Sequence, residues 1–227
     1  MSAAAEKRTP ELSVAPAILL SMTGVTGIVD AVSYLGLGHV FTANMTGNVV
    51  LLGFALAGTP GLSISRSVLA LVCFFGGAVV GGRIPIVQAA RAFAVEAALL
   101  LAAAVIAFRL APPNEVISTA TYGVIATTGV AMGMRNAMVR KLAVPDLTTT
   151  VLTLTIAGLA ADSVLAGGNS PRWQRRSAAV VMMLAGAATG AALLRRSAAL
   201  PLAIAAAITA ACALITYSVH RKETQQQ

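Results

Sequence analysis

The chain has 227 residues, of which 57% are hydrophobic and only 11% are charged, and its mean hydropathy is +0.83. Soluble domains contain about 45–50% apolar and about 25% charged residues, so this composition excludes an ordinary soluble protein. The net charge of +8 comes from Lys and Arg residues in short connectors between apolar runs, which is typical of membrane topology signals and excludes nucleic-acid binding as an explanation.

Eight apolar stretches follow one another along the chain, between a tail at 1–14 and a second tail at 220–227. They cover residues 16–34, 40–58, 68–87, 93–110, 117–139, 147–165, 178–194 and 198–219. Each approaches the roughly 17–25 residues that a helix needs to cross the hydrocarbon core of a bilayer. No clear cleavage site follows the first stretch, so we expect it to stay in the membrane. The sequence therefore predicts an all-α polytopic membrane protein.

The two halves of the chain resemble each other in register. A shift of 106 residues places the first four stretches on the last four without a gap, with GIVDA at 27–31 over GMRNA at 133–137, Thr42 over Thr148 and Arg66 over Arg172. Weak identity in such a register is typical of duplicated membrane proteins. We therefore expect two tandem repeats, 15–111 and 112–219, within one integral membrane domain.

Positive charge favours one topology for these stretches. If all eight crossed, Lys and Arg would be divided almost evenly between the two sides, and the repeats would be parallel. If the segments 40–58 and 147–165 each instead enter and leave on one side, most Lys and Arg residues lie on one side of the membrane. Only four lie on the other side: Arg66, Arg109, Arg195 and Arg196. Positive residues concentrate on the cytoplasmic side. We therefore expect six transmembrane helices, two short re-entrant segments, inverted repeats and both termini in the cytoplasm.

The second stretch begins with an unusually polar sequence, FTANMTGN at 41–48. On a helix, Thr42 and Thr46 would lie on one face, and Asn44 and Asn48 on nearly the opposite one. Polar or irregular backbone at membrane depth is tolerated only inside protein or beside a water-filled cavity. We expect this segment and its repeat mate at 147–156 to face the interior.

Two blocks carry a resemblance to a known family. GIVDAVSYLGLGHVFTANMTGNVVLLGFALAG and GMRNAMVRKLAVPDLTTTVLTLTIAGLAADS resemble the signature blocks of the YoaK-like family of bacterial inner-membrane proteins, domain of unknown function 1275. The resemblance spans nearly the whole chain. It implies a multi-pass inner-membrane protein, usually drawn with six helices, and it carries over no activity and no site residue.

Ionisable residues within the stretches are the first candidates for a substrate site, because burying a charge in a membrane is costly. Asp30 is the one acid of the first stretch, and its repeat mate is Asn136, next to Arg135. Asp30 fits a site for a coupling proton or cation, a structural hydrogen bond, or a position at the membrane surface. We expect Arg135 to be its ion-pair partner, and Glu96 to pair with a neighbouring Arg or to reach the interface.

The polar residues of the short segments complete the predicted substrate-binding set. Asn44, Thr46 and Asn48 either line a solute path or cap and hold a re-entrant helix. Thr148 and Thr150 belong to the same set, although threonine hydroxyls often bond only to a preceding carbonyl. Asp162 fits a position at the water boundary. GxxxG spacings predict close helix packing at three places: Gly77 and Gly81, Gly129 and Gly133, and Gly186 and Gly190.

Motifs for other chemistry are missing from the sequence. The two histidines and two cysteines are far apart, so we expect no metal, no cofactor and no disulfide. No nucleotide loop or nucleophile motif points to an enzyme. The sequence favours a small-solute transporter or channel with a polar site at the repeat interface; the alternative is a non-transporting structural or accessory membrane protein. The expected partners are the lipid bilayer, a small solute or proton, and a second copy in a homodimer.

Overall fold

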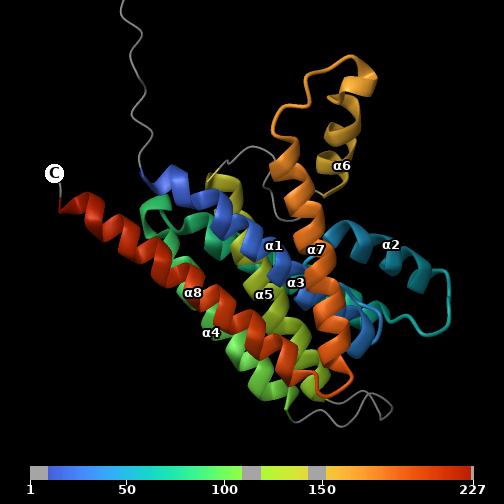
Figure 1. Ribbon diagram of the computed structural model, residues 1–227. Helices are drawn as coiled ribbons and strands as arrows, with labels where there is room; N and C mark the ends of the chain where they lie inside the picture. Colours follow the sequence, from blue (N-terminus) through green and yellow to red (C-terminus); the bar gives the residue numbers. More distant parts are fainter. Residues whose placement is uncertain (1–9, 109–118, 143–151, 226–227) are drawn as a thin grey trace, which may run out of the picture.

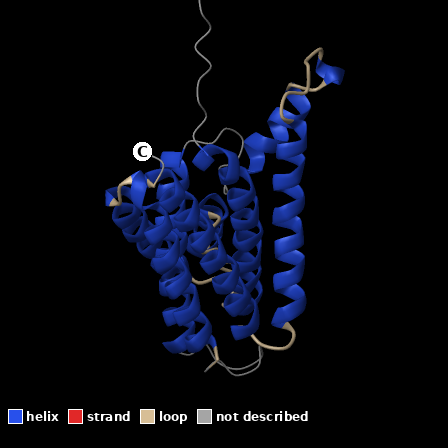
Figure 2. Ribbon diagram, turned by 60° about the vertical axis from the view of Figure 1, so that its left-hand side comes forward, coloured by secondary structure: helices blue, strands red, loops and turns tan. Residues whose placement is uncertain are grey.

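The computed structural model describes residues 10–108, 119–142 and 152–225, and in these ranges every regular element is a helix (Figure 2). The long helices are α1 (Pro10–Gly36), α3 (Ile64–Arg83), α4 (Ala89–Ala107), α5 (Thr119–Leu142), α7 (Trp173–Leu194) and α8 (Ala199–Thr224). The short ones are α2 (Met45–Leu56), α6 (Leu152–Ala161) and the single 3-10 turns η1 (Ile86–Gln88) and η2 (Val164–Ala166). The all-α prediction is confirmed for this part of the chain.

Five helical segments are long and apolar enough to cross a membrane. They are Pro16–Gly36, Ile64–Arg83, Ile86–Ala107, Trp173–Leu194 and Ala199–Lys222. α5 has 24 residues but is not among them. α2 and α6 have 12 and 10 residues, which at about 1.5 Å per residue reach only about half of the hydrocarbon thickness. The protein is thus a multi-pass helical membrane protein.

Large apolar side chains cover much of the outer surface. Phe75 of α3, Leu184 of α7 and Leu214 of α8 are 71%, 69% and 69% exposed. A soluble monomer would rarely leave contiguous apolar surface in contact with water. Lipid chains are the surroundings that this surface fits, in agreement with the hydropathy of the helices.

Two pairs of long helices run side by side and parallel, held close by glycine. A Cβ added at Gly81 of α3 would lie 2.6 Å from the carbonyl oxygen of Met134 in α5. Along the same contact, Gly77 meets Val130, so the residue numbers of both helices rise together. α1 and α7 pack in the same way, with Gly186 against Gly24 and Gly190 against Ile28. The predicted close packing at the GxxxG spacings is confirmed, since Gly129 and Gly133 also meet α3 directly.

The ends of the bundle can be identified from contacts near the helix termini. Lys141, at the end of α5, donates hydrogen bonds of 2.6 Å to the carbonyl oxygens of Gly82 and Ile84, so α3 and α5 finish at the same end. Leu19, Val139 and Ala179 form one buried cluster there, which also places the beginnings of α1 and α7 at that end. At the other end, Gly36 of α1 lies against Leu194 of α7.

The connections that contain the two short helices start from opposite ends of the bundle; Figure 1 shows α6 beyond the start of α7 and α2 projecting from the side of the bundle. Gly38, just after α1, lies against the guanidinium of Arg66, near the beginning of α3, so the chain that contains α2 leaves and re-enters at one end. α6 packs beside the beginning of α7, where Arg176 donates a 2.7 Å hydrogen bond to the carbonyl oxygen of Gly158. Each short helix therefore connects two long helices without passing through the bundle.

Candidate functional site

The carboxylate of Asp30 holds the beginning of α2 in place. Its Oδ1 accepts hydrogen bonds from the backbone N–H groups of Ala43 at 3.0 Å and Asn44 at 3.3 Å. Asn44 is the N-cap of α2, and its own Oδ1 accepts a bond from the N–H of Gly47 at 3.2 Å. Free N–H groups and the helix dipole make the start of a helix favourable for a negative charge. This explains why an acid in α1 is matched to this turn.

Asp30 is an interior residue. It is only 5% exposed and lies six residues before Gly36, the end of α1, which corresponds to about 9 Å along the helix. The carboxylate is therefore enclosed by protein and is not exposed at the surface of the bundle. The chain from 37 to 44 folds back along α1 to reach it, and α2 then leads away from the bundle (Figure 1).

Residues 41–44 are not helical, so the helical faces drawn from the sequence do not apply to them. Thr42 and Asn48 are both completely buried, whereas Thr46 is exposed on α2. The Nδ2 of Asn48 donates a 3.0 Å hydrogen bond to the carbonyl oxygen of Ser67 in α3. The expectation of an interior location is thus correct for Thr42 and Asn48 and wrong for Thr46.

Several polar atoms around the start of α2 are buried without a hydrogen-bond partner in the described part of the chain. They are Asp30 Oδ2, Thr42 Oγ1, Asn48 Oδ1 and Arg66 Nε. We call this set the α2 entry. Leaving such an atom unsatisfied costs about 1–3 kcal/mol, and native proteins usually avoid this cost except where a ligand, water or functional need explains it.

A cavity of about 350 Å³ lies beside the α2 entry, between α1 and α7. Asp30 and Asn44 are its polar lining residues, together with Tyr34, whose ring stacks on that of Phe41 with centroids 4.9 Å apart. α7 contributes Met183, Ala187 and Ala191 to the wall. The cavity therefore joins residues of both halves of the chain around one buried carboxylate.

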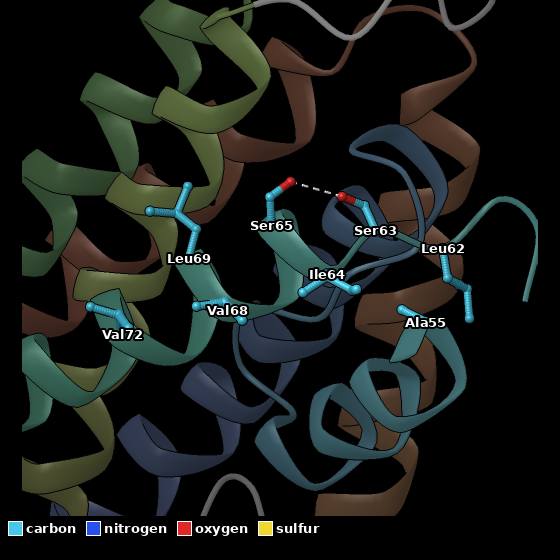
Figure 3. Close-up of a pocket in the computed structure, with 8 residues that line it drawn as sticks. All are labelled: Ala55, Leu62, Ser63, Ile64, Ser65, Val68, Leu69 and Val72. Atoms are coloured by element: carbon cyan, nitrogen blue, oxygen red, sulfur yellow. Dashed lines mark hydrogen bonds between the residues drawn. The ribbon is translucent and has the colours of Figure 1, made fainter. Parts of the chain in front are cut away.

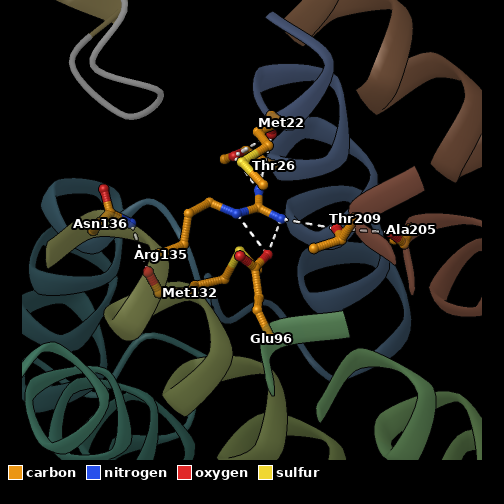
Figure 4. Close-up of polar contacts among 8 residues, drawn as sticks. All are labelled: Met22, Thr26, Glu96, Met132, Arg135, Asn136, Ala205 and Thr209. Carbon is orange, nitrogen blue, oxygen red and sulfur yellow. Dashed lines mark hydrogen bonds and ion pairs between the residues drawn. The ribbon is translucent and has the colours of Figure 1, made fainter. Parts of the chain in front are cut away.

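Arg135 is the centre of a second buried polar cluster (Figure 4). Its Nε donates to Oε1 of Glu96 at 2.6 Å, and its Nη2 forms an ion pair with the same oxygen. Its Nη1 bonds to the carbonyl oxygen of Met22 at 2.9 Å and to Oγ1 of Thr26 at 3.0 Å. The expected pairing of Arg135 with Asp30 is wrong, because α5 packs against α4, which carries Glu96. For Glu96, the alternative of an ion pair with an Arg is confirmed.

Of the remaining predicted residues, those that the structure describes do not line the cavity. Asn136 donates to the carbonyl oxygen of Met132 at 2.8 Å within its own helix, and Thr148 and Thr150 lie outside the described residues. Asp162 is partly exposed, as predicted, and pairs with Arg176 at 2.6 Å. Sequence reasoning missed the burial of Arg66; its place beside a polar re-entrant segment was the available signal.

A larger groove of about 850 Å³ lies between the end of α2 and the beginning of α3 (Figure 3). Its walls are mainly apolar, including Ile64, Val68 and Val72, all of them exposed. Ser63 and Ser65 bond to each other at 3.0 Å. No charged residue lines this groove, so the cavity at Asp30 is the better candidate for a polar site. Among the described residues, no group of His, Cys, Asp and Glu is placed to hold a metal ion.

Comparison with known proteins places this architecture in a family. Residues 18–215 match the family model described as "Protein of unknown function (DUF1275)". The chain is 36% identical over 155 residues to the UPF0700 transmembrane protein YoaK of Bacillus subtilis (strain 168); the aligned part is 63% of this chain and 65% of that relative. No solved structure matches. Because the family model covers most of the chain, the protein belongs to the DUF1275 family of transmembrane proteins, as its two sequence blocks predicted.

Proposed function

We propose that this protein is a small-solute transporter or channel of the bacterial inner membrane, with its polar site where the two halves of the chain meet. The observation that carries the proposal is the cavity between α1 and α7 that contains the buried carboxylate of Asp30. Ionisable residues inside a membrane protein are costly, and they are usually retained where they bind or relay something.

The glycine contacts support the view that the halves are repeats. Gly27 of α1 lies against Met183 and Ala187 of α7, with its added Cβ 2.7 Å from the N of Ala187. Gly133 of α5 lies against Phe74 and Ala78 of α3 in the same arrangement, 2.9 Å from the N of Ala78. The contact between α1 and α7 is therefore repeated between α5 and α3, with α5 in the place of α1 and α3 in the place of α7.

The same contacts revise the register of the repeat. Gly27 and Gly133 are 106 residues apart, whereas Phe74 and Met183 are 109 apart. The gap-free superposition therefore fits α1 and α5 but needs three more residues before α7. Arg66 then corresponds to Arg175 and not to Arg172.

We infer that α5 is the sixth crossing. It runs parallel to α3, and its 24 residues would extend about 36 Å. The polar residues that lower its hydropathy, including Thr121, Thr128 and Arg135, are buried and would not meet lipid. With α2 and α6 remaining at opposite ends, the two halves would have inverted topology and both termini would be cytoplasmic, which agrees with the distribution of positive charge.

Inverted repeats with interrupted segments at corresponding positions are the architecture in which many secondary transporters place their substrate near the midplane. The α2 entry has the required features, since it combines a helix beginning inside the bundle with unsatisfied polar atoms. Most buried polar atoms in native proteins have partners, so four unpaired atoms gathered at one place support a role beyond packing.

The proposal can be tested with purified protein in proteoliposomes and a panel of small cations, anions and neutral solutes. Charged solutes would be followed by solid-supported-membrane currents and neutral ones by stopped-flow light scattering. We expect one class to give a signal above empty liposomes, lost in Asp30→Asn and kept in Asp162→Asn, which removes a carboxylate outside the cavity. No signal for any class would refute transport and favour the structural or accessory alternative.

A further inference from the structure

The charge in the wall of the cavity at Asp30 is negative. Its wall contains the carboxylate of Asp30 but no Lys, Arg or His among the residues that line it. Arg66 belongs to the α2 entry but does not line the cavity. The carboxylate is therefore the only charged group among the lining side chains, and the apolar wall screens it poorly.

The two oxygens of Asp30 are used differently. Oδ1 accepts the N–H groups of Ala43 and Asn44, and Oδ2 is buried with no partner among the described residues. The fixed carboxylate occupies the place at the start of α2 where an anionic solute would otherwise bind. The cavity is therefore unfavourable to anions, whereas a donor with positive charge would form the stronger, charge-assisted hydrogen bond with this carboxylate.

The donor set is too small for a bare divalent metal ion. Of the lining residues, only Asp30, Tyr34 and Asn44 carry a side-chain oxygen, and Oδ1 of Asn44 already accepts the N–H of Gly47. Calcium takes six to eight oxygen ligands, and magnesium needs an octahedral shell. An ammonium group needs far fewer acceptors, because part of its stabilisation can come from an aromatic face.

The rest of the wall suits an apolar body. Tyr34 and Phe41 present stacked rings, and Met183 contributes a flexible, polarisable side chain from α7. A volume of about 350 Å³ is at the small end of the range for ligand sites, and would hold a molecule of about the size of a single substituted ring.

We propose that the cavity binds a monovalent organic cation, with its ammonium group at the carboxylate of Asp30 and its apolar body beside Tyr34, Phe41 and Met183. This inference rests on the proposed transport function, for which it names the substrate class. It also explains why the carboxylate is placed at the junction of α1, the α2 entry and α7.

The test compares three probes of nearly the same shape: phenethylammonium, phenylethanol and phenylacetate. Binding to the purified full-length protein would be measured by isothermal titration calorimetry in detergent micelles. We expect saturable binding of phenethylammonium, at least tenfold tighter than that of the other two and weakened at least tenfold in Asp30→Asn. Asp162→Asn is the matched control and should bind like the parent protein.

A second variant, Ala191→Leu, fills the cavity without touching the carboxylate and should also abolish binding, so the test does not depend on the stability of Asp30→Asn. Equal binding of phenylacetate, or no binding of phenethylammonium, would overturn the inference. The proteoliposome panel separates the two proposals. Transport confined to neutral or anionic solutes would support the proposed function and refute this substrate class. Cation binding without any transport would support the binding site and refute the transport function.

Discussion

Arg135 and Glu96 form an ion pair in the centre of the bundle, where the two side chains are completely inaccessible to solvent. The pair joins α5 to α4, and further bonds from Arg135 reach Met22 and Thr26 in α1 and Thr209 in α8. Four of the six long helices are therefore held by one guanidinium. A buried charge is tolerated only when it is paired and hydrogen-bonded, so each partner is needed mainly because the other is present.

Replacing one partner of this pair should be more harmful than replacing both. We expect Glu96→Met or Arg135→Met to lower the free energy of unfolding by about 3–5 kcal/mol, since each leaves an unpaired buried charge or acceptor. The double variant should recover much of this loss. Thermal unfolding in detergent measures the effect, with Arg91→Met, which removes an exposed arginine, as the control. Single variants no worse than this control would contradict the assigned role.

Asp30 should show separate structural and functional contributions. Asp30→Asn keeps a side-chain oxygen for the N–H groups of Ala43 and Asn44, while Asp30→Ala removes it. We expect Asp30→Ala to lose about 1–3 kcal/mol of stability, because buried donors remain unsatisfied, and Asp30→Asn to lose less. Both should fail in transport. Equal stability of the two variants, measured by thermal unfolding, would mean that this cap does not hold α2.

The long helices were predictable because their signal is apolar length. The predicted stretches 16–34 and 178–194 lie inside α1 and α7, and 198–219 begins one residue before α8. Boundaries near polar residues were less predictable. The stretch 40–58 contains a helix only from Met45 onward, because Asn44 caps it and the preceding residues extend back to Asp30.

The site was predictable only in part, because single residues can be recognised in a sequence but their partners cannot. Asp30 was a candidate as the lone acid of its stretch. The match with Arg135 failed because Arg135 reaches α1 at Met22 and Thr26, before Asp30, and forms its ion pair with Glu96 of α4. Helix neighbours depend on small residues such as Gly81 and Gly133, which identify a close contact but not the helix that makes it.

Two adjacent glycines near the end of α3 provide a direct test of helix packing. Gly81→Ala would place a Cβ 2.6 Å from the carbonyl oxygen of Met134, while Gly82→Ala meets nothing within 4 Å. We expect Gly81→Ala to cost about 1–3 kcal/mol through overcrowding. Gly82→Ala should be neutral or stabilising by about 0.5–1 kcal/mol, since alanine is the better helix former. Thermal unfolding compares them; similar values would argue against close contact of α3 and α5.

The placement of α2 and α6 at opposite ends leads to a topology prediction. Thr59 follows α2 and Asn169 follows η2, and both residues are exposed. In a background with Cys73→Ala and Cys212→Ala, Thr59→Cys should react with a membrane-impermeant thiol reagent in intact cells, and Asn169→Cys should react only after permeabilisation. This follows because α1 would carry the chain outward before α2, whereas α5 would return it to the cytoplasm before α6. Labelling of both residues in intact cells would place the two connections on one side, and inverted halves would then be impossible. If neither cysteine were labelled before permeabilisation, both connections would lie in the cytoplasm, and inverted halves would again be excluded. Only the asymmetric result is compatible with a solute site between α1 and α7 that is reached from alternate sides.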